Sequence, residues 1–408
     1  MGRELIARFP IGAAATVAEL EADPHPLLAR LRAHEPVSWL PALGGWLVTS
    51  RDLAVRVMRE ADVFTVDDPR FSTARVVGPS MLSLDGPVHA RHRDPFARPL
   101  RPARTRARFT AFIEAEVARL VDGLAPAGRA ELRGDLAGPL AVAVVAEALG
   151  LNGVDAATVR SWYAAFVEAV SAITAGQAPP DRARAARERL RAAVEDALSG
   201  HGSLLADAAR HEAGLTTAEV VSNAAVLMFG GIDTTEGMIV NAVRHLLSHP
   251  DQLALVRRDP ALLDAAIEES LRLEPSAAVV DRYATRDVRL GEADIRKGDL
   301  VRVSIAGANR DPAVFSDPDR FDVRRANLSD HVAFARGPHF CFGAPLARLE
   351  TRTALAALLE RLPGLRLDPA FPTSPKGLVF RKPPHLHVLW DVPGATGALD
   401  GGDEHRGE

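Results

Sequence analysis

The segment between Thr216 and Ser248 constrains the fold of this 408-residue chain more than any other. Thr216 begins a Thr-x-x-Glu pattern, which is typical of a helix N-terminus, and Pro250 marks the far end. A helix of this length extends over roughly 48 Å. Its middle, at 224–232, is apolar on every side. Such a helix must cross the protein interior, so we expect the rest of the chain to pack around it.

Glycines and polar residues interrupt this apolar helix just past its middle. Gly230 and Gly231 come immediately before Ile232, and Asp233 and Thr234 follow it. Two adjacent glycines cost about 1–2 kcal/mol relative to alanines, and a buried carboxylate costs more unless it is paired or hydrated. Two interpretations remain open here. Either the helix is kinked and its polar groups bind backbone, or it widens into a groove beside a ligand with a polar relay at the floor. The neighbouring threonine, at position 235, should face elsewhere and be structural.

Cys341 is the only cysteine, which excludes a disulfide framework and any cysteine-rich zinc or iron–sulfur site. It lies just before a helix that we expect to begin near 344, where the helix dipole and free N–H groups favour a thiolate. Gly337 and Gly343 allow unusual backbone angles and close approach. The alternative is a buried, inert thiol, the commonest fate of a lone cysteine. The apolar residues around it are Phe334, Phe340 and Phe342.

A second helix is expected between Pro260 and Pro275. Glu269 and Arg272 stand three residues apart on it and therefore share one side. By themselves they could be an ordinary exposed pair that contributes a few tenths of a kcal/mol.

The remaining pattern predicts a mainly helical fold with small sheets. We expect one domain over 1–392 and a disordered Gly-rich tail over 393–408. The expected helices cover about 24–34, 51–60, 108–124, 137–149, 155–175 and 181–200, and the expected strands lie at 46–50, 288–291, 299–307 and 385–390.

Composition excludes several classes of function. The net charge of −4 offers no global basic excess for a nucleic acid. The chain has no uninterrupted stretch of 18 apolar residues, so no membrane span is predicted, and the N-terminus has no export signal. We therefore expect a protein of the reducing cytoplasm, without a nucleic-acid or membrane partner. The absence of a Gly-x-Ser-x-Gly pattern argues against a serine hydrolase.

Together, three motifs resemble the cytochrome P-450 family. The segment Phe334-x-x-Gly-x-His-x-Cys341-x-Gly343 resembles its haem-binding loop. The pair at 269 and 272 resembles its Glu-x-x-Arg helix, and 230–234 resembles its oxygen-activation motif. The motifs occur in the family's order, and the resemblance extends from about 20 to 390. It implies a triangular, helix-rich fold with haem between a long distal helix and the proximal cysteine loop.

The resemblance implies roles for residues around haem b. Cys341 would be the thiolate ligand to iron, with backbone N–H groups after it bonding the sulfur. Phe334 would exclude water from the sulfur. The sequence departs from the family at Ala335, where many relatives have glycine, and at Phe342, where leucine is common. Neither change removes a required chemical group.

Basic residues are needed for the haem propionates, and arginine suits carboxylates because its guanidinium pairs with both oxygens. The resemblance identifies candidates at His89, Arg93, Arg282 and His339. A solvated surface side chain is the alternative for each. Glu269 and Arg272 become a structural ion pair, and the family adds a third basic residue to them. Its candidates here are Arg320, Arg324 and Arg325.

On the distal side, the resemblance implies a proton relay for O2 as co-substrate. Asp233 would supply protons from solvent and Thr234 would position a water, while Gly230 and Gly231 leave room. The segment 67–82 should cover the haem. Trp162, Tyr163 and Phe166 could roof the pocket or pack in the core. Substrate contacts are expected at Ala225, Phe229, Ala277, Ala278, Val279, Val379 and Phe380, which favours an apolar small molecule.

The favoured function is therefore an O2-dependent monooxygenase, plausible in secondary metabolism, that hydroxylates or epoxidises an apolar small molecule. The chain has the length of a member without a fused reductase, so electrons should come from a ferredoxin and an NAD(P)H-dependent ferredoxin reductase. The alternatives are the same haem-thiolate site with atypical chemistry, namely coupling, desaturation, nitration or peroxide-driven oxidation, and a non-catalytic haem sensor. A sensor would not need the polar relay at Asp233 and Thr234.

Overall fold

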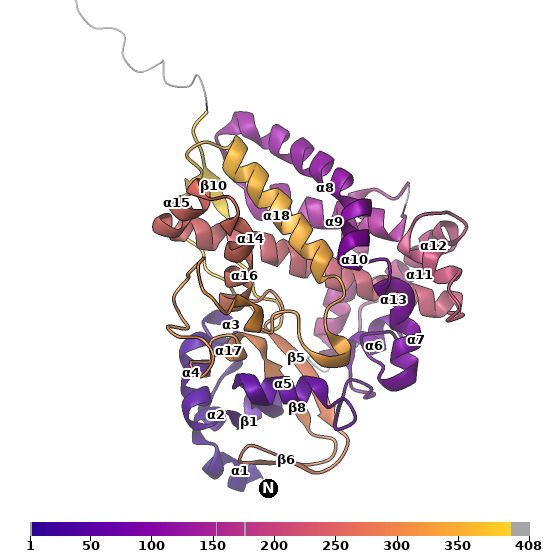
Figure 1. The fold of residues 1–408 in the computed structure, drawn as a ribbon. Coiled ribbons are helices and arrows are strands. Elements are labelled where there is room, and N and C mark those ends of the chain that lie inside the picture. The colour runs from indigo at the N-terminus through magenta and orange to yellow at the C-terminus, as the bar shows by residue number, and fades with distance from the viewer. Residues whose placement is uncertain (1, 152, 175–176, 393–408) are drawn as a thin grey trace, which may run out of the picture.

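A helical lobe and a sheet-rich lobe lie against each other in the computed structural model, which describes residues 2–151, 153–174 and 177–392 (Figure 1). The mainly helical fold with small sheets is confirmed. The expected tail at 393–408 lies outside the described residues. None of the described helices is both long and apolar enough to span a membrane.

Most of the helical lobe comes from the middle of the chain. Five of the six helices expected over the whole chain lie within two residues of their expected ends, while α8 begins at Pro102 instead of 108. Its helices are α6 (Ser72–Val77), α7 (Gly86–Ala97), α8 (Pro102–Leu124), α9 (Gly138–Leu149), α10 (Ala156–Thr174), α11 (Asp181–Leu198), α12 (Leu204–Ala209), α13 (Thr217–Gly231), α14 (Asp233–Ser248), α15 (Pro250–Arg258), α16 (Leu262–Leu273) and α18 (Ala344–Arg361), with the short turns η2 (Ala125–Ala127) and η3 (Arg133–Ala137).

The sheet lobe joins the first residues of the chain to a late segment. Its five-stranded sheet has the order β1-β2-β8-β5-β3, in which only the β2–β8 pair is parallel. The strands are β1 (Val37–Leu40), β2 (Gly45–Val48), β3 (Phe64–Thr65), β5 (Val279–Ala284) and β8 (Leu300–Ser304), and β6 (Val288–Leu290) pairs with β7 (Ala293–Ile295). Its helices are α1 (Gly2–Arg8), α2 (Pro10–Ala14), α3 (Val17–Ala22), α4 (His25–His34), α5 (Arg51–Arg59) and α17 (Ile305–Ala308), with η1 (Pro41–Leu43), η4 (Leu328–Asp330) and η5 (Gly337–His339).

A third sheet pairs β4 (Arg129–Glu131) with β10 (His387–Leu389), and β10 with β9 (Arg366–Leu367). One strand prediction was too long. The expected strand over 299–307 ends at Ser304, whose hydroxyl accepts a hydrogen bond from the Gly307 N–H at 3.0 Å. This cap turns the chain into α17.

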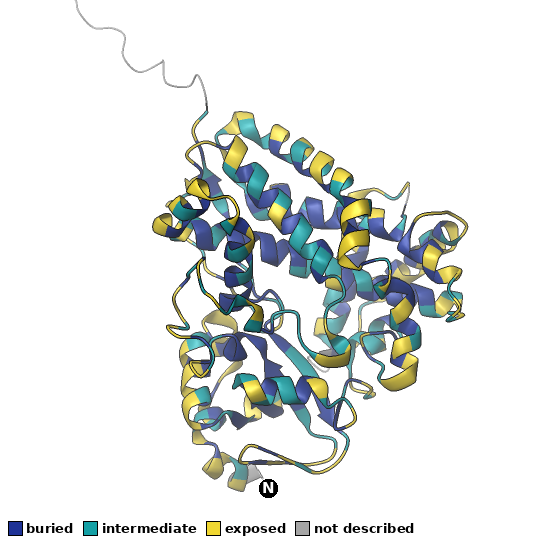
Figure 2. Ribbon diagram, viewed as in Figure 1, coloured by how far each residue is buried: buried dark blue, intermediate teal, exposed yellow. Residues whose placement is uncertain are grey.

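The apolar segment forms two helices on nearly one line, α13 and α14, which are dark blue along the centre of Figure 2. The expected capping box is present, since the Thr216 hydroxyl and the Glu219 carboxylate bond each other's backbone N–H groups. The helix runs through the largest apolar cluster, as its composition predicted. It is interrupted at Ile232, immediately after the two glycines.

Candidate haem and oxygen site

The main cavity lies between two parts of the chain. The junction of α13 and α14 is on one side, and the cysteine loop with the start of α18 is on the other. Its volume is about 280 Å³. Apolar side chains form most of its wall, together with Gly230, Gly231 and Thr234 on one side and Phe334, Cys341 and Gly343 on the other. Met81 and Leu82, from the segment expected to cover this space, also reach it. Two of the three sequence motifs, the segment 230–234 and the cysteine loop, therefore meet across one cavity.

The two glycines of α13 have different surroundings. A Cβ built on Gly231 would lie 2.4 Å from Val145 Cγ2, so this glycine permits close packing on α9. A Cβ on Gly230 would meet nothing within 4 Å and would enter the cavity. Thr234 also lines the cavity, and its hydroxyl donates to the Gly230 carbonyl at 2.5 Å. Features of both open interpretations are therefore present. The helix is interrupted at Ile232 and the Thr234 hydroxyl binds backbone, while Gly230 and Thr234 line a cavity.

Thr235 was expected to face elsewhere, and that prediction was wrong, because it lines the same cavity while being almost fully buried. Two consecutive helical residues are about 100° apart, so a broad cavity can reach both.

The cysteine loop holds Cys341 beside the start of α18. The Cys341 N–H donates to the Phe334 carbonyl at 2.9 Å, and backbone N–H groups of Gly343 and Ala344 donate to the sulfur, as expected. A favoured thiolate was also expected. In the protein alone the opposite holds, because burial raises the pKa of the Cys341 thiol more than these N–H groups lower it. A bound cation such as iron would reverse this balance.

The glycines of this loop differ from the prediction. Gly343 has φ −76°, an ordinary helical angle, so it needs no special conformation. A Cβ there would lie 3.7 Å from the sulfur, which is normal contact. Gly337 does have a left-handed φ of 74°, and its Cβ would lie 2.3 Å from the Met58 carbonyl. The glycine requirement in this loop therefore lies at Gly337.

The four candidate propionate partners gather near one edge of the cavity. His89 and His339 have ring centroids 4.3 Å apart, and Arg93 donates to the Phe340 carbonyl. Arg282 is buried close enough to Asp85 for that carboxylate to favour its charged form. Arg93 and His339 also line the cavity. Residues from α7, β5 and the cysteine loop thus form one cluster of two arginines and two histidines.

This cluster has an unmet need for negative charge. Burial, followed by the positive neighbours His339 and Arg93, lowers the pKa of His89 to about 4. The His89 Nε2 atom is buried and has no hydrogen-bond partner. Arg282 donates to the Asp281 carbonyl at 2.7 Å, which uses one of its five N–H groups. Carboxylates placed here would satisfy these groups, so the residues fit the propionates of a haem.

Asp85 was not recognised in the sequence, although it lies four residues before His89. Its Oδ1 atom is 2.8 Å from His339 Nε2, and its Oδ2 atom accepts from the Thr65 hydroxyl and the Val66 N–H. Burial raises the pKa of Asp85, but these hydrogen bonds have the larger effect and lower it to about 2. Asp85 therefore stays ionised and fixes the His339 ring.

On the proximal side, Arg348 was also missed. Its guanidinium lies 4.5 Å from the centre of the Phe334 ring and pairs with Glu268 at 2.6 Å. Glu268 also binds His331 at 2.9 Å. Burial raises the pKa of Glu268, while hydrogen bonds from these two partners lower it to about 2. The chain Glu268–Arg348–Phe334 thus holds the aromatic ring beside the sulfur.

The Glu269–Arg272 pair is fully buried, unlike the exposed alternative. Arg272 donates to both Glu269 carboxylate oxygens, at 2.7 and 2.9 Å. Arg325 supplies the third member at 3.0 Å, which resolves the choice among three arginines. Arg320 contributes its carbonyl oxygen to both other arginines. Arg324 is exposed.

The expected substrate residues are only partly on the cavity wall. Ala277 lines the cavity, whereas Ala225, Phe229, Ala278, Val279, Val379 and Phe380 are not among its lining residues. Phe229 packs against Tyr163 and Phe166, with ring centroids 5.7 and 6.2 Å away. The core alternative therefore holds for these two aromatic residues, because they fill the space between α10 and α13.

Asp233 faces away from the cavity. It does not line the cavity, and it pairs with Lys382, from the segment between α18 and β10. Lys382 also contacts Glu236 at 2.7 Å, and Glu236 accepts from Arg133 at 2.5 Å. Burial raises the pKa of Glu236, but Lys382 and Arg133 produce a net lowering. Sequence motifs gave no sign of this network, because its members are distant along the chain.

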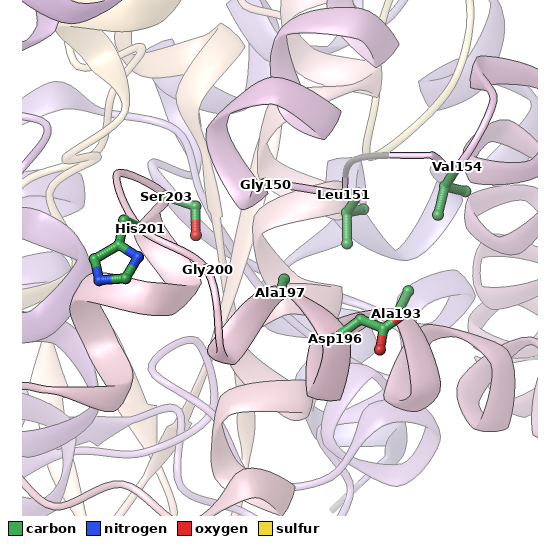
Figure 3. Close-up of a pocket in the computed structure, with 9 residues that line it drawn as sticks. All are labelled: Gly150, Leu151, Val154, Ala193, Asp196, Ala197, Gly200, His201 and Ser203. Atoms are coloured by element: carbon green, nitrogen blue, oxygen red, sulfur yellow. The ribbon is translucent and has the colours of Figure 1, made fainter.

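A smaller cavity of about 140 Å³ lies where α9 and α11 end, just before α12 (Figure 3). Its wall includes Gly150, Leu151, Asp196, His201 and Ser203, and none of the predicted haem or oxygen residues. The Ser203 side chain is already used to cap α12. The chemistry expected from the sequence therefore belongs to the larger cavity.

Comparison with known proteins gives a consistent result. The sequence pattern that describes the family Cytochrome P450 matches residues 182–388. The cytochrome P450 monooxygenase PikC of Streptomyces venezuelae is 37% identical, over 92% of this chain and 91% of that protein. The 20-oxo-5-O-mycaminosyltylactone 23-monooxygenase of Streptomyces fradiae is 33% identical, over 90% of this chain and 88% of that protein. The crystal structure of CalO2 has a TM-score of 0.84 and 31% identity, and the match covers 93% of this chain and all of that one.

Proposed function

Since this chain belongs to the cytochrome P450 family and is a monooxygenase, we propose that it uses haem b and O2 to oxidise an apolar small molecule, by hydroxylation or epoxidation. The observation that carries the proposal is the cavity with Cys341 on one wall, Thr234 on the other, and at its edge a cluster of basic residues in which His89 Nε2 is buried without a partner. Relatives that act in secondary metabolism support the same role for this chain.

The haem would be held at both ends of the cavity by residues described above. Cys341 would ligate the iron, Phe334 would shield the sulfur, and the cluster of His89, Arg93, Arg282 and His339 would bind the propionates. Bound there, the haem supplies an iron that binds O2, and thiolate ligation favours O–O cleavage. Gly230 leaves space in the cavity beside α13, because it has no side chain. Thr234 can hold a water there, because its hydroxyl can both donate and accept.

The proposed substrate is apolar because the cavity wall is mostly aliphatic. Leu82, Val226, Leu227 and Val280 contribute side chains to it, together with Ala277. A screen of apolar small molecules, read by displacement of the iron's distal water in the absorption spectrum, would identify the class. Electrons would come from a ferredoxin and its NAD(P)H-dependent reductase.

The proposal is tested through the axial ligand. The purified protein, reduced and exposed to carbon monoxide, should show the red-shifted Soret band of thiolate ligation. Cys341→Ala should lose that band while keeping the far-ultraviolet circular dichroism of the native helices. Persistence of the band in a folded Cys341→Ala protein would contradict the assignment.

A further inference from the structure

Two adjacent residues of α13 hold a loop that contributes to the cavity wall. We call this loop, residues 77–83, the cover loop. The Ser222 hydroxyl donates to the Val77 carbonyl at 2.7 Å, and Asn223 Oδ1 accepts a hydrogen bond from the Met81 N–H at 2.9 Å. The side chains of both α13 residues are buried. The cover loop is therefore attached to α13 near each of its ends.

The attachment at Met81 lies next to an opening of the cavity. Met81 and Leu82 both line the cavity. Met81 is 3% exposed, whereas Leu82 is 36% exposed, so the cavity wall reaches the protein surface at Leu82. The position of the Met81 backbone therefore sets how far Leu82 covers this opening. We call the hydrogen bond between Met81 and Asn223 the latch.

The orientation of the Asn223 amide follows from its backbone partners. The Met81 N–H can only donate, so it must face Oδ1. The Glu219 carbonyl can only accept, so it must face Nδ2, which lies 2.9 Å away. The second N–H of Nδ2 is then directed at His92 Nδ1, at 3.1 Å. His92 Nδ1 must therefore be an acceptor without a proton.

This assignment fixes the state of the His92 ring. Because Nδ1 has no proton, the single proton of the neutral ring is on Nε2, which donates to Glu219 Oε1 at 3.2 Å. Burial lowers the pKa of His92 below its ordinary value of 6.5, although Glu219 acts in the opposite direction. The ring is therefore neutral at neutral pH, as the hydrogen bond from Asn223 requires.

Few ionisable groups face His92. Glu219 of α13 accepts from it, and Arg91, from its own helix α7, pairs with the same carboxylate. His89, one turn earlier, has a pKa of about 4 and is uncharged at neutral pH. The single ionisable residue of α12, which also packs on α7, is Asp207, and it pairs with an arginine of α8. The cover loop has no ionisable side chain. A proton on His92 would therefore act most directly on Asn223.

We propose that Asn223 is a positioning residue that latches the cover loop over the cavity while His92 is neutral and releases it when His92 is protonated. The latch thereby limits the size of the molecules that enter. This inference rests on the proposed function, in which the cavity receives the substrate. In the release, a proton from solvent forms an N–H bond at His92 Nδ1. That N–H would point at the Asn223 Nδ2 group, so the amide must rotate, and the Met81 N–H loses its acceptor.

The latch is tested through the Met81 amide, without turnover. Selective 15N labelling of the five methionines is applied to the full-length holoprotein in its diamagnetic ferrous carbon-monoxide form, and Met81→Leu assigns the Met81 signal. We expect Asn223→Leu to lower the hydrogen-exchange protection of this amide about tenfold, because its acceptor is lost. The amides of Met58 and Met238, inside helices, are the internal references. Unchanged protection of Met81 in folded Asn223→Leu would overturn the proposal.

The part played by His92 is tested with the native protein and does not depend on whether Asn223→Leu folds. The lowered pKa places protonation of His92 at acid pH, so the latch is closed above that pKa and opens below it. Protection of Met81, corrected for the intrinsic pH dependence of exchange, should fall between about pH 7.5 and about pH 5. His92→Leu should keep the latch closed and abolish the fall. A native protein without the fall, or a His92→Leu protein that retains it, would refute release by His92.

Ser222→Ala is the matched control for both measurements. It removes a buried hydrogen bond from the adjacent α13 residue to the same cover loop, but at Val77. We expect the Met81 amide of this variant to keep most of its protection and the full fall with pH. A loss of Met81 protection equal to that in Asn223→Leu would show that the loop responds to any lost contact, which contradicts a specific latch.

Entry by size is tested with imidazole and the bulkier 4-phenylimidazole as ligands of the ferric iron. Stopped-flow measurement of the Soret shift gives both association rates. Asn223→Leu should raise the rate for 4-phenylimidazole about fivefold or more relative to the rate for imidazole, whereas Ser222→Ala should leave this ratio near its native value. An unchanged ratio in Asn223→Leu would refute control of entry by the latch.

Failure of the proposed function would give a different result. A native protein without the thiolate band, and without a Soret shift for either ligand, would contradict the monooxygenase. A native protein that shows both signals, but whose Met81 protection responds neither to Asn223→Leu nor to pH, would refute the latch alone.

Discussion

At the scale of single residues, the backbone of the cysteine loop explains a departure noticed in the sequence. Ala335 stands where many family members have glycine, and its φ is 59° in the structure. A left-handed angle costs a non-glycine residue about 1–2 kcal/mol. The protein therefore tolerates strain six residues before its proposed axial ligand.

Ala335→Gly should relieve this strain. We expect the free energy of unfolding to rise by about 1 kcal/mol, because the lost backbone strain exceeds the entropy gained by the unfolded chain. Chemical denaturation measures the change. Ala333→Gly in the same loop is the control, and it should be destabilising because Ala333 has no left-handed angle. Equal destabilisation by both variants would contradict the strain.

Thr234 should control coupling and leave substrate affinity unchanged. Its hydroxyl lines the cavity, so Thr234→Ala should consume reductant at a comparable rate while forming less product and more hydrogen peroxide. The ratio of product to peroxide per NAD(P)H measures this. A folded, substrate-binding Thr234→Ala enzyme that remains fully coupled would exclude the role.

Asp233→Asn should behave differently, because it removes the carboxylate that we propose as the proton supply. We expect the whole cycle to slow by about 100-fold, with a raised solvent isotope effect and coupling close to normal. If both variants chiefly lost haem or stability, the two residues would be structural.

At the scale of elements, the three-residue ion cluster fixes α16 to the segment before the cysteine loop. Glu269 receives guanidinium groups from its own helix and from Arg325. Arg325 also donates to the Ser316 carbonyl at 2.6 Å. A buried carboxylate with several donors holds distant segments together, provided that all its donors remain.

Arg325→Met should therefore destabilise the protein. We expect a loss of about 3 kcal/mol in unfolding free energy, because Glu269 stays buried with fewer donors. Arg324→Met, one residue earlier and exposed, should change stability by less than about 0.5 kcal/mol. Similar midpoints for the two variants in denaturant would show that the third arginine adds nothing.

The end of α16 adds a dependence on pH. Burial raises the pKa of Glu274, but hydrogen bonding from His25 and the charge of Arg381 lower it to about 2. Because folding lowers the pKa of Glu274, its ionised form stabilises the fold at pH values above 4.5, the usual pKa of this carboxyl group. This stabilisation is lost as the pH falls toward 2. Unfolding free energy should fall between pH 4.5 and 2.5, and Glu274→Gln should flatten that fall. An unchanged slope in the variant would contradict the assignment.

At the scale of the whole molecule, charge is unevenly distributed around the cysteine side. Arg101, Arg104 and Arg106 are exposed, and none of their guanidinium groups pairs with a carboxylate among the described residues. They lie at the start of α8, which packs along α18, the helix that follows Cys341 (Figure 1). Phe340 is an exposed aromatic residue in the adjoining loop. This face is suited to an acidic electron donor.

Charge reversal tests that docking site. Arg101→Glu with Arg104→Glu should slow reduction of the iron by the ferredoxin at low salt, and should leave substrate binding unchanged. The rate of the native protein should fall as salt rises, while the variant should depend on salt less. Arg257→Glu with Arg258→Glu, exposed on α15, is the control. If the first variant were reduced as fast as the native protein, the electron donor would have to dock on another face.

Local signals explain which parts could be predicted from the sequence. The capping box at Thr216 and the apolar run after it predict a helix from residues that are close together in the sequence. The third arginine of the ion cluster could not be chosen, because three arginines share one short segment and tertiary contacts select Arg325. Lys382 went unnoticed for a similar reason, since its partners are 149 and 146 residues away in the chain. Sequence patterns locate motifs, but they do not show what faces them.

The parallel pairing of β2 with β8 has a consequence for biosynthesis. Trp46 pairs with Val301, and Ala130 pairs with Val388 in the sheet of β4, β10 and β9. While a ribosome makes the chain from its N-terminus, β2 remains an unpaired edge until most of the polypeptide has emerged. Nascent chains halted before β8 should therefore bind chaperones through that edge.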